Sequence, residues 1–151
     1  MTLKITLKPN ERIVVNGCVI RNTDRRNALV FETHADIVRE ADLLTPDAKA
    51  TPVGRAYYLI QTALLQVDLR DKIVGGIQQD LANLAACFSD RMRGAVVQAA
   101  THVSCADYYK ALSALRPVLR YEATLLDVNA HDAAARELSA HDAGAGDMVP
   151  A

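Results

Sequence analysis

The sequence predicts an α+β protein, in which a small antiparallel β module precedes a bundle of about four helices. Residues 1–44 alternate apolar and polar side chains with the two-residue period of strands. Residues 45–126 instead carry apolar side chains at the three- and four-residue spacing of helices. The composition shifts to Ala, Asp, Gly and His from residue 127 onward, and these residues bury little apolar surface. Residues 127–151 are therefore expected to form a mostly disordered tail, with a short helix near Ala133–Leu138 as the alternative.

Short strands are predicted in the β module at residues 2–8, 13–15, 18–20, 28–31 and 35–40. In the first strand Leu3, Ile5 and Leu7 alternate with polar residues, so this strand should bury one face. Asn16-Gly17 separates two β-branched runs and is a strong hairpin signal, because both central positions of a type I′ turn need a positive φ. The strands are expected to pair as a small antiparallel meander.

The first helix should begin after Thr51, an N-cap residue that is followed by proline at the first helical position. A second helix is expected over residues 71–88, with Gly75 and Gly76 inside it. Each glycine costs about 1 kcal/mol relative to alanine in a helix interior. Close contact with another helix, or a break in this one, would explain the pair.

Two further helices complete the predicted bundle. Asp90 is the candidate N-cap of the third helix, and Ser104 is the candidate N-cap of the fourth. Pro117 is expected to end or kink the fourth helix, because proline lacks an N–H group and clashes with the preceding turn. A helical pattern then resumes over residues 118–126.

Composition and motifs exclude several classes of protein. The formal net charge of −1 excludes a histone-like polycation, and no apolar run approaches the roughly 20 residues of a membrane-spanning helix. The N-terminus lacks the apolar stretch of a secretory signal, so a cytoplasmic protein is expected. Cys18, Cys87 and Cys105 are too few and too far apart for a disulfide framework.

Candidate groups for chemistry are scarce. The sequence holds no phosphate-binding glycine loop, no nucleophile elbow and no His-Glu-x-x-His motif. His102 and Cys105 have the spacing of half a zinc site, but no second pair completes four ligands. We therefore expect a protein that is not an enzyme, with no catalytic residues, no metal and no cofactor.

Cations cluster in the β module. Lys4 and Lys8 share one face of a strand, and Arg21, Arg25 and Arg26 share one loop. Clustered cations beside a small sheet suit the phosphates of a nucleic acid. The alternative interpretation is solubility and the protection of edge strands against aggregation.

The run from Leu3 to Gly17 resembles the opening of the FlbT family of flagellum biosynthesis regulators. Residues 27–31, 37–40 and 51–58 resemble the same family, so the likeness covers roughly residues 1–126. This resemblance implies a cytoplasmic post-transcriptional repressor of flagellin synthesis. Such a protein binds the 5′ untranslated region of flagellin mRNA, promotes decay of that mRNA, and acts alongside a small partner, FlaF.

The strands alone are similar to the CsrA family of mRNA-binding regulators, which forms a strand-exchanged dimer and grips GGA-containing loops with its first and last strands. This similarity implies RNA contacts by Ile5 and Lys8 in the first strand and by Ile37 and Arg39 in the last. Leu7 stands where that family has an arginine, which suggests that this face is partly buried under the helical half.

RNA binding without chemistry is thus the predicted function. The residues predicted to contact RNA are Lys4, Ile5, Lys8, Arg12, Arg21, Arg25, Arg26, Ile37 and Arg39. A homodimer is expected, because a β module of this size lies near the lower limit for independent folding.

A protein-interaction module or chaperone-like assembly factor is the alternative, with FlaF or flagellin bound on the helical half. Exposed tyrosines in the pairs Tyr57-Tyr58 and Tyr108-Tyr109 would favour it, although one tyrosine of each pair is expected to pack in the core.

Overall fold

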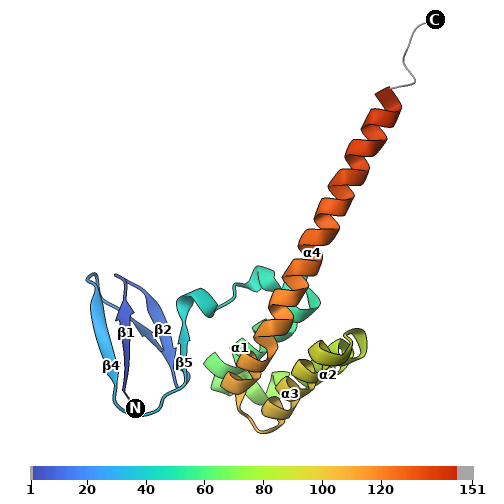
Figure 1. Cartoon of the computed structure of the whole chain (residues 1–151). Coiled ribbons are helices and arrows are strands. Elements are labelled where there is room, and N and C mark those ends of the chain that lie inside the picture. The colour runs from blue at the N-terminus through green and yellow to red at the C-terminus, as the bar shows by residue number, and fades with distance from the viewer. Residues whose placement is uncertain (1, 146–151) are drawn as a thin grey trace, which may run out of the picture.

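The computed structural model describes residues 2–145 and has the predicted α+β architecture. Figure 1 shows the β module beside a bundle of helices, from which the last helix projects. No helix in the described part of the chain is long and apolar enough to cross a membrane. The strands are β1 (Leu3–Leu7), β2 (Arg12–Val15), β3 (Cys18–Arg21), β4 (Asn27–Phe31) and β5 (Ile37–Arg39). The α-helices are α1 (Pro52–Leu65), α2 (Arg70–Cys87), α3 (Asp90–Ser104) and α4 (Tyr108–Ala145), and the short 3-10 helices are η1 (Glu40–Asp42), η2 (Pro46–Ala50) and η3 (Val67–Leu69).

The strands form two small antiparallel sheets rather than one meander. One sheet pairs β1 with β4, and the other has the order β3-β2-β5. The β2–β3 hairpin turns at Asn16 and Gly17, with φ values of 49° and 81°, as the sequence predicts. The expected pairing of β1 with β2 is wrong, because the turn after β1 carries the chain into the other sheet. Asn10, with φ of 61°, donates its N–H there to the Thr23 carbonyl at 2.8 Å.

Strand β2 is buried on both faces and joins the two halves of the molecule. Ile13 packs with Ile5 and Leu7 between the two sheets. Val14 points the other way and, with Val38 of β5, belongs to the same core as the helices. Leu7 is 2% exposed, so its predicted burial is confirmed, but the two sheets cover it rather than the helical half.

The first two helices begin close to the predicted residues. The Thr51 hydroxyl accepts a hydrogen bond from the Gly54 N–H at 3.1 Å, as an N-cap residue should. Helix α2 continues unbroken through Gly75 and Gly76, and a Cβ atom at either position would meet nothing within 4 Å. Neither close helix contact nor a break explains these two glycines.

The predicted caps of the last two helices lie at other residues. Ser89 occupies the position before α3, and Asp90 is its first helical residue. Ser104 ends α3, and the cap of α4 is Asp107, whose Oδ1 accepts from the Lys110 N–H at 3.1 Å. The intervening Ala106 takes a left-handed conformation, with φ of 56°, and this reverses the chain.

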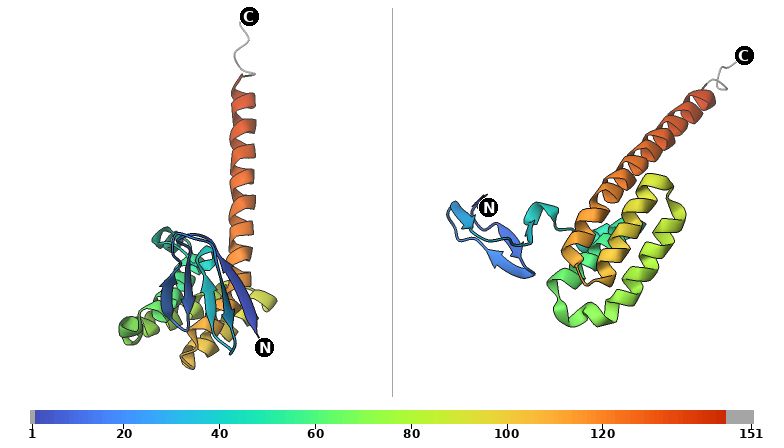
Figure 2. Two further views of the ribbon diagram at one scale, coloured as in Figure 1. Left: turned by 90° about the vertical axis from the view of Figure 1, so that its left-hand side faces the viewer. Right: turned by 60° about the horizontal axis from the view of Figure 1, so that its bottom comes forward.

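Helix α4 is longer than the sequence suggests. It continues through Pro117, because Leu115 and Val118 pack in the core on either side, while Pro117 itself is exposed. Where a disordered tail is expected from residue 127, the helix runs on to Ala145 and includes the predicted short helix at 133–138. Alanine has the highest helix propensity, which favours this extension. Figure 2 shows the extension leaving the body, and residues 146–151 lie outside the described part of the chain.

The tyrosine pairs divide as expected. Tyr57 and Tyr108 are 1% and 5% exposed, whereas Tyr58 and Tyr109 are only partly buried. The Tyr57 hydroxyl accepts from Nε of Arg116 at 3.3 Å. These pairs therefore serve the core of the helical body more than its surface.

Candidate nucleic-acid interface

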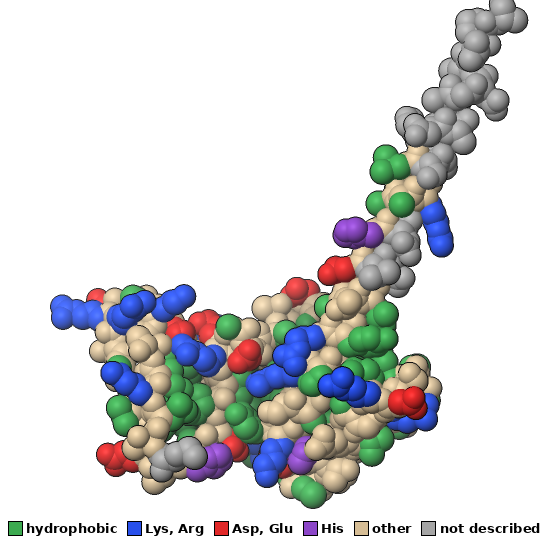
Figure 3. Space-filling view, viewed as in Figure 1, with side chains coloured by type: hydrophobic (Ala, Val, Ile, Leu, Met, Phe, Trp, Pro, Cys, Tyr) green, Lys and Arg blue, Asp and Glu red, His purple; other side chains and the backbone are tan. Residues whose placement is uncertain are grey.

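One end of the β module gathers most of the cations predicted to bind RNA. The strand register places Arg12 opposite Arg21 and places Arg39 opposite the residue after Arg12. The same register sets the last residue of β1, which precedes Lys8, opposite the first residue of β4. Lys and Arg side chains crowd this end in Figure 3. We call it the basic end, and it comprises Lys8, Arg12, Arg21, Arg25, Arg26 and Arg39.

Two of these cations are already paired. Nε of Arg12 lies 3.3 Å from Oε1 of Glu40, and Nη2 of Arg39 lies 3.2 Å from Oε1 of Glu11. Asp24 lies in the same loop as Arg25 and Arg26. Among residues 2–145, four exposed cations of the basic end make no ion pair and are available to a polyanion: Lys8, Arg21, Arg25 and Arg26.

Arg39 has a structural role in addition to its position at the basic end. Its Nη2 donates to the Thr6 carbonyl at 3.0 Å as well as to the Glu11 carboxylate, so it ties β5 to β1. The Arg39 side chain is 45% exposed and the Glu11 side chain is 14% exposed. The similarity to CsrA implies an RNA contact by Arg39, and one of the two terminal nitrogens of its guanidinium is already engaged within the protein.

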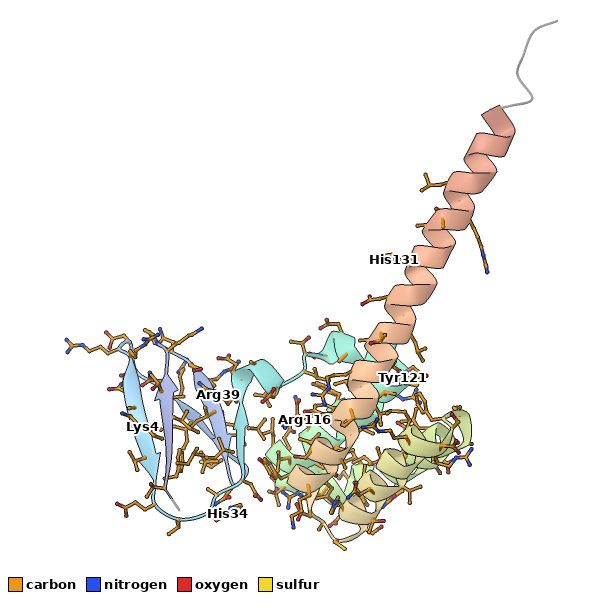
Figure 4. All side chains as sticks on the ribbon, in the orientation of Figure 1. Lys4, His34, Arg39, Arg116, Tyr121 and His131 are labelled. Atoms are coloured by element: carbon orange, nitrogen blue, oxygen red, sulfur yellow. The ribbon has the colours of Figure 1, made fainter. Side chains whose placement is uncertain are left out.

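Three predicted RNA-binding residues lie away from the basic end. Lys4 is exposed midway along β1, as Figure 4 shows. Ile5 is 8% exposed and packs between the sheets, so its side chain is not presented to a ligand. Ile37 lies at the far end of β5 and packs against the same small core. The apolar contacts implied by the similarity to CsrA are thus not on this surface.

Two asparagines absent from the predicted RNA-binding residues, Asn22 and Asn27, organise the loop between β3 and β4. The side-chain Nδ2 of Asn27 donates to Oδ1 of Asn22 at 2.9 Å, to Oγ1 of Thr23 at 3.1 Å and to the Arg25 carbonyl at 3.1 Å. Asn22 in turn reaches the end of β1. An asparagine at each end of a cation-bearing loop is the signal that could have identified them, because this side chain readily bonds nearby backbone.

The contacts between Arg12 and Glu40 also shift the pKa of the Glu40 carboxyl. The Arg12 backbone N–H donates to Oε2 of Glu40 at 3.2 Å, and this bond, with the Arg12 guanidinium, holds the pKa of the Glu40 carboxyl below its ordinary value of 4.5. The same contacts fix the start of β2 to the linker helix η1.

Two arginines of the helical body, Arg70 and Arg93, bond carbonyls at helix ends. Arg70 donates from Nε to the Ala63 carbonyl at 2.6 Å, near the end of α1. Arg93 donates from Nε to the Phe88 carbonyl at 3.1 Å, just beyond the end of α2. Such bonds satisfy carbonyls that a helix end leaves unpaired. In the described residues no group of three or more His, Cys, Asp or Glu side chains is placed to hold a metal ion. The basic end is the best-supported candidate site.

Comparisons with known proteins agree on one family. Residues 3–126 match the family described as "Flagellar protein FlbT". A protein of Rhodopseudomonas palustris (strain TIE-1), named "Probable flagellum biosynthesis repressor protein FlbT", is 35% identical over 129 residues, which cover 83% of this chain and 98% of the relative. The "Flagellum biosynthesis repressor protein FlbT" of Caulobacter vibrioides (strain ATCC 19089 / CIP 103742 / CB 15) is 34% identical over 127 residues, covering 81% and 87% of the two chains.

A third relative, from Rhizobium leguminosarum bv. trifolii (strain WSM2304), has the same name as the first and is 29% identical over 127 residues, covering 83% of this chain and 85% of its own. No solved structure is significantly similar to this chain. The matched region spans the β module, the basic end and the helical body up to the point where α4 leaves it. As its N-terminal strands predict, the chain belongs to the FlbT family.

Proposed function

We propose that this protein represses flagellum biosynthesis after transcription, by binding the 5′ untranslated region of flagellin mRNA and promoting decay of that mRNA. Relatives that cover most of the chain are named flagellum biosynthesis repressors. The observation that carries the RNA-binding step is the basic end, where four cations without an ion pair in the described structure lie together.

Phosphate contacts dominate the proposed interaction. Phe31 is the sole aromatic residue among residues 1–44, and it packs on the small core between the sheets. The β module therefore has no second Phe, Tyr or Trp ring for base stacking, whereas its lysines and arginines suit the RNA backbone. Four phosphate contacts to a single strand give a log–log salt slope of about −3, which weakens binding about 50-fold between about 50 and 200 mM salt.

Repression follows from where the protein is bound. A protein that occupies the leader of an mRNA blocks the ribosome, and an mRNA without ribosomes is open to nucleases. The helical body lies beside the basic end rather than beneath it, so it remains free to contact another protein while RNA is bound (Figure 1). This mechanism needs no catalytic group in the repressor.

We also propose that the protein acts as a homodimer. Val19 and Ile20 of β3 and Leu29 and Val30 of β4 are exposed. In the described structure β3 pairs only with β2, and β4 pairs only with β1, so each strand keeps a free edge. A free apolar edge favours pairing with another chain. Light scattering after gel filtration should give twice the 16.4 kDa chain mass, and a monomer at micromolar concentration would contradict this.

The test of the main proposal uses the full-length protein and labelled flagellin leader RNA. Fluorescence anisotropy should show binding to this RNA that weakens as the salt concentration rises. Transcripts that carry this leader should decay more slowly in cells that lack the protein. Absence of RNA binding at low salt would contradict the proposal.

A second candidate function is binding of FlaF or flagellin by the helical body. The aromatic rings of Phe88 and Tyr121 meet edge to face at 6.1 Å, where α4 leaves the bundle. Tyr121, Leu125 and Leu126 are 42%, 41% and 48% exposed there. Calorimetric titration with purified FlaF, using the protein as it stands and a Tyr121→Ser variant, would show whether this corner binds a protein. The 260/280 nm absorbance ratio before and after nuclease treatment would report bound RNA instead.

A further inference from the structure

Asn22 is the first residue of the loop between β3 and β4, which carries Arg25 and Arg26 of the basic end. Its backbone N–H donates to the Glu11 carbonyl at 2.8 Å, which fixes its position beside β2. Its side-chain Nδ2 then donates to the carbonyl oxygens of Leu7 at 3.3 Å, Lys8 at 2.8 Å and Arg25 at 2.8 Å. One amide group therefore joins the end of β1 to the loop between β3 and β4.

From this geometry we infer that Asn22 is the positioning residue of the RNA-binding surface. It holds the backbone of Lys8 and the backbone of Arg25 to the same nitrogen atom, so the two backbone positions that carry these cations stay in a fixed relation. Arg21 precedes Asn22 directly and is fixed with it. This inference rests on the proposed RNA-binding function and adds a residue that itself carries no charge.

The chemistry of the position requires an amide. Alanine offers no donor to the three carbonyl oxygens, and aspartate at neutral pH offers only acceptors. The Oδ1 atom of Asn22 is also used, because it accepts from the Thr23 N–H at 2.9 Å. Both ends of this side chain are therefore committed to backbone groups that hold the loop in one conformation.

Positioning and charge have different signatures in an RNA-binding measurement. Removing a cation that contacts phosphate reduces the salt slope by about one. Removing a positioning residue leaves every cation in place, so the slope is kept. The loop must then be ordered during binding, and affinity falls at each salt concentration by about three- to tenfold.

The experiment measures the affinity of the full chain for a labelled single-stranded RNA at several salt concentrations. The test variant is Asn22→Ala, and Lys8→Ala serves as the charge comparison. The matched control is Asn83→Ala on α2, which removes an exposed asparagine that accepts only from Gln79 at 3.3 Å. Thermal melts establish that each variant is folded at the assay temperature.

The inference predicts weaker binding by Asn22→Ala with an unchanged salt slope, a reduced slope for Lys8→Ala, and no change for Asn83→Ala. Affinity of Asn22→Ala within twofold of the unsubstituted protein would overturn the inference alone. If the unsubstituted protein does not bind RNA, the proposed function and the inference both fail. Should Asn22→Ala not fold, Asn27→Ala removes the second amide of the same loop. Weaker RNA binding with an unchanged salt slope is then expected of Asn27→Ala, and affinity within twofold of the unsubstituted protein would overturn the inference.

Discussion

The β module and the helical body differ in how they use apolar and charged residues. The helical body buries a large core, in which Tyr57, Ile60 and Leu112 are at most 1% exposed. The β module buries only a few side chains between its sheets, including Ile5 and Ile13. Most of its cations lie at one exposed end, whereas Arg70 and Arg93 of the helical body each bond a carbonyl at the end of the preceding helix.

The helical body is thus expected to provide most of the stability, and the basic end of the β module is expected to provide the RNA affinity. A large apolar core stabilises the fold, and free cations contribute little to stability at an exposed surface. Val14 and Val38 connect the two halves, because they lie in the helical core although they belong to β strands. Substitutions in the helices should therefore change the free energy of unfolding, and substitutions at the basic end should change RNA affinity.

The largest expected effect is that of Leu112→Ala in the helical core. Leu112 is 0% exposed, and replacing a fully buried leucine by alanine costs about 2–5 kcal/mol. Denaturant unfolding should show this loss, while RNA affinity at a temperature where the variant is folded should stay the same. A loss under about 1 kcal/mol would mean that the helical body is not the main source of stability.

Arg39→Ala tests whether Arg39 mainly stabilises the fold or mainly binds RNA. Because Arg39 bonds Thr6 and Glu11, its removal should lower the free energy of unfolding by about 1 kcal/mol. Glu11→Gln removes the charge of the same pair and gives the double-variant cycle. If Arg39→Ala leaves stability unchanged and lowers RNA affinity about tenfold or more, base contact and not strand tethering is the role of this residue.

Gly76→Ala should stabilise the helical body by about 1 kcal/mol, because this position is inside α2 and a Cβ atom there meets nothing within 4 Å. Gly54 is the matched control. A Cβ atom at Gly54 would lie 2.1 Å from the Ala48 carbonyl oxygen, so Gly54→Ala should destabilise the protein. Opposite shifts in the melting temperature are expected, and equal shifts would contradict this packing.

The smallest effect concerns pH and Glu40. Since the folded state lowers the pKa of Glu40, the stabilisation is present above the unfolded pKa and is lost as the pH falls through the folded pKa. Glu40→Gln should thus melt slightly lower than the unsubstituted protein at neutral pH, and the two should converge in acid. A difference that persists below both pKa values would assign the effect to something other than this charge.

Local signals in the sequence predicted local structure well. The strand at Leu3–Leu7, the Asn16-Gly17 turn and the Thr51 cap depend on neighbouring residues, and each is confirmed, although Leu3, expected on the buried face, is 51% exposed. The pairing of β1 with β4 depends on contacts far apart in the chain, and no local pattern marks it. The prediction of Ser104 as a cap is wrong because the chain reverses direction at Ala106, and alanine rarely adopts a positive φ.

The candidate site could be predicted from the sequence only where it depends on neighbouring residues. Arg21, Arg25 and Arg26 share one loop, so their proximity follows from the sequence. The bond from Arg39 to Glu11 joins residues 28 positions apart, and only the fold shows that it exists. The burial of Ile5 likewise depends on the second sheet packing across it.

We propose that the basic end, and no other cationic surface of this chain, holds RNA. The most direct test is the salt dependence of RNA affinity for a variant in which Lys8, Arg21, Arg25 and Arg26 are all changed to Ala. A control variant changes four exposed cations of the helices to Ala: Lys72, Arg91, Arg120 and Arg136. We predict that the control keeps a slope of about −3, whereas the slope and affinity of the first variant fall toward zero. Equal slopes for the two variants would contradict the account.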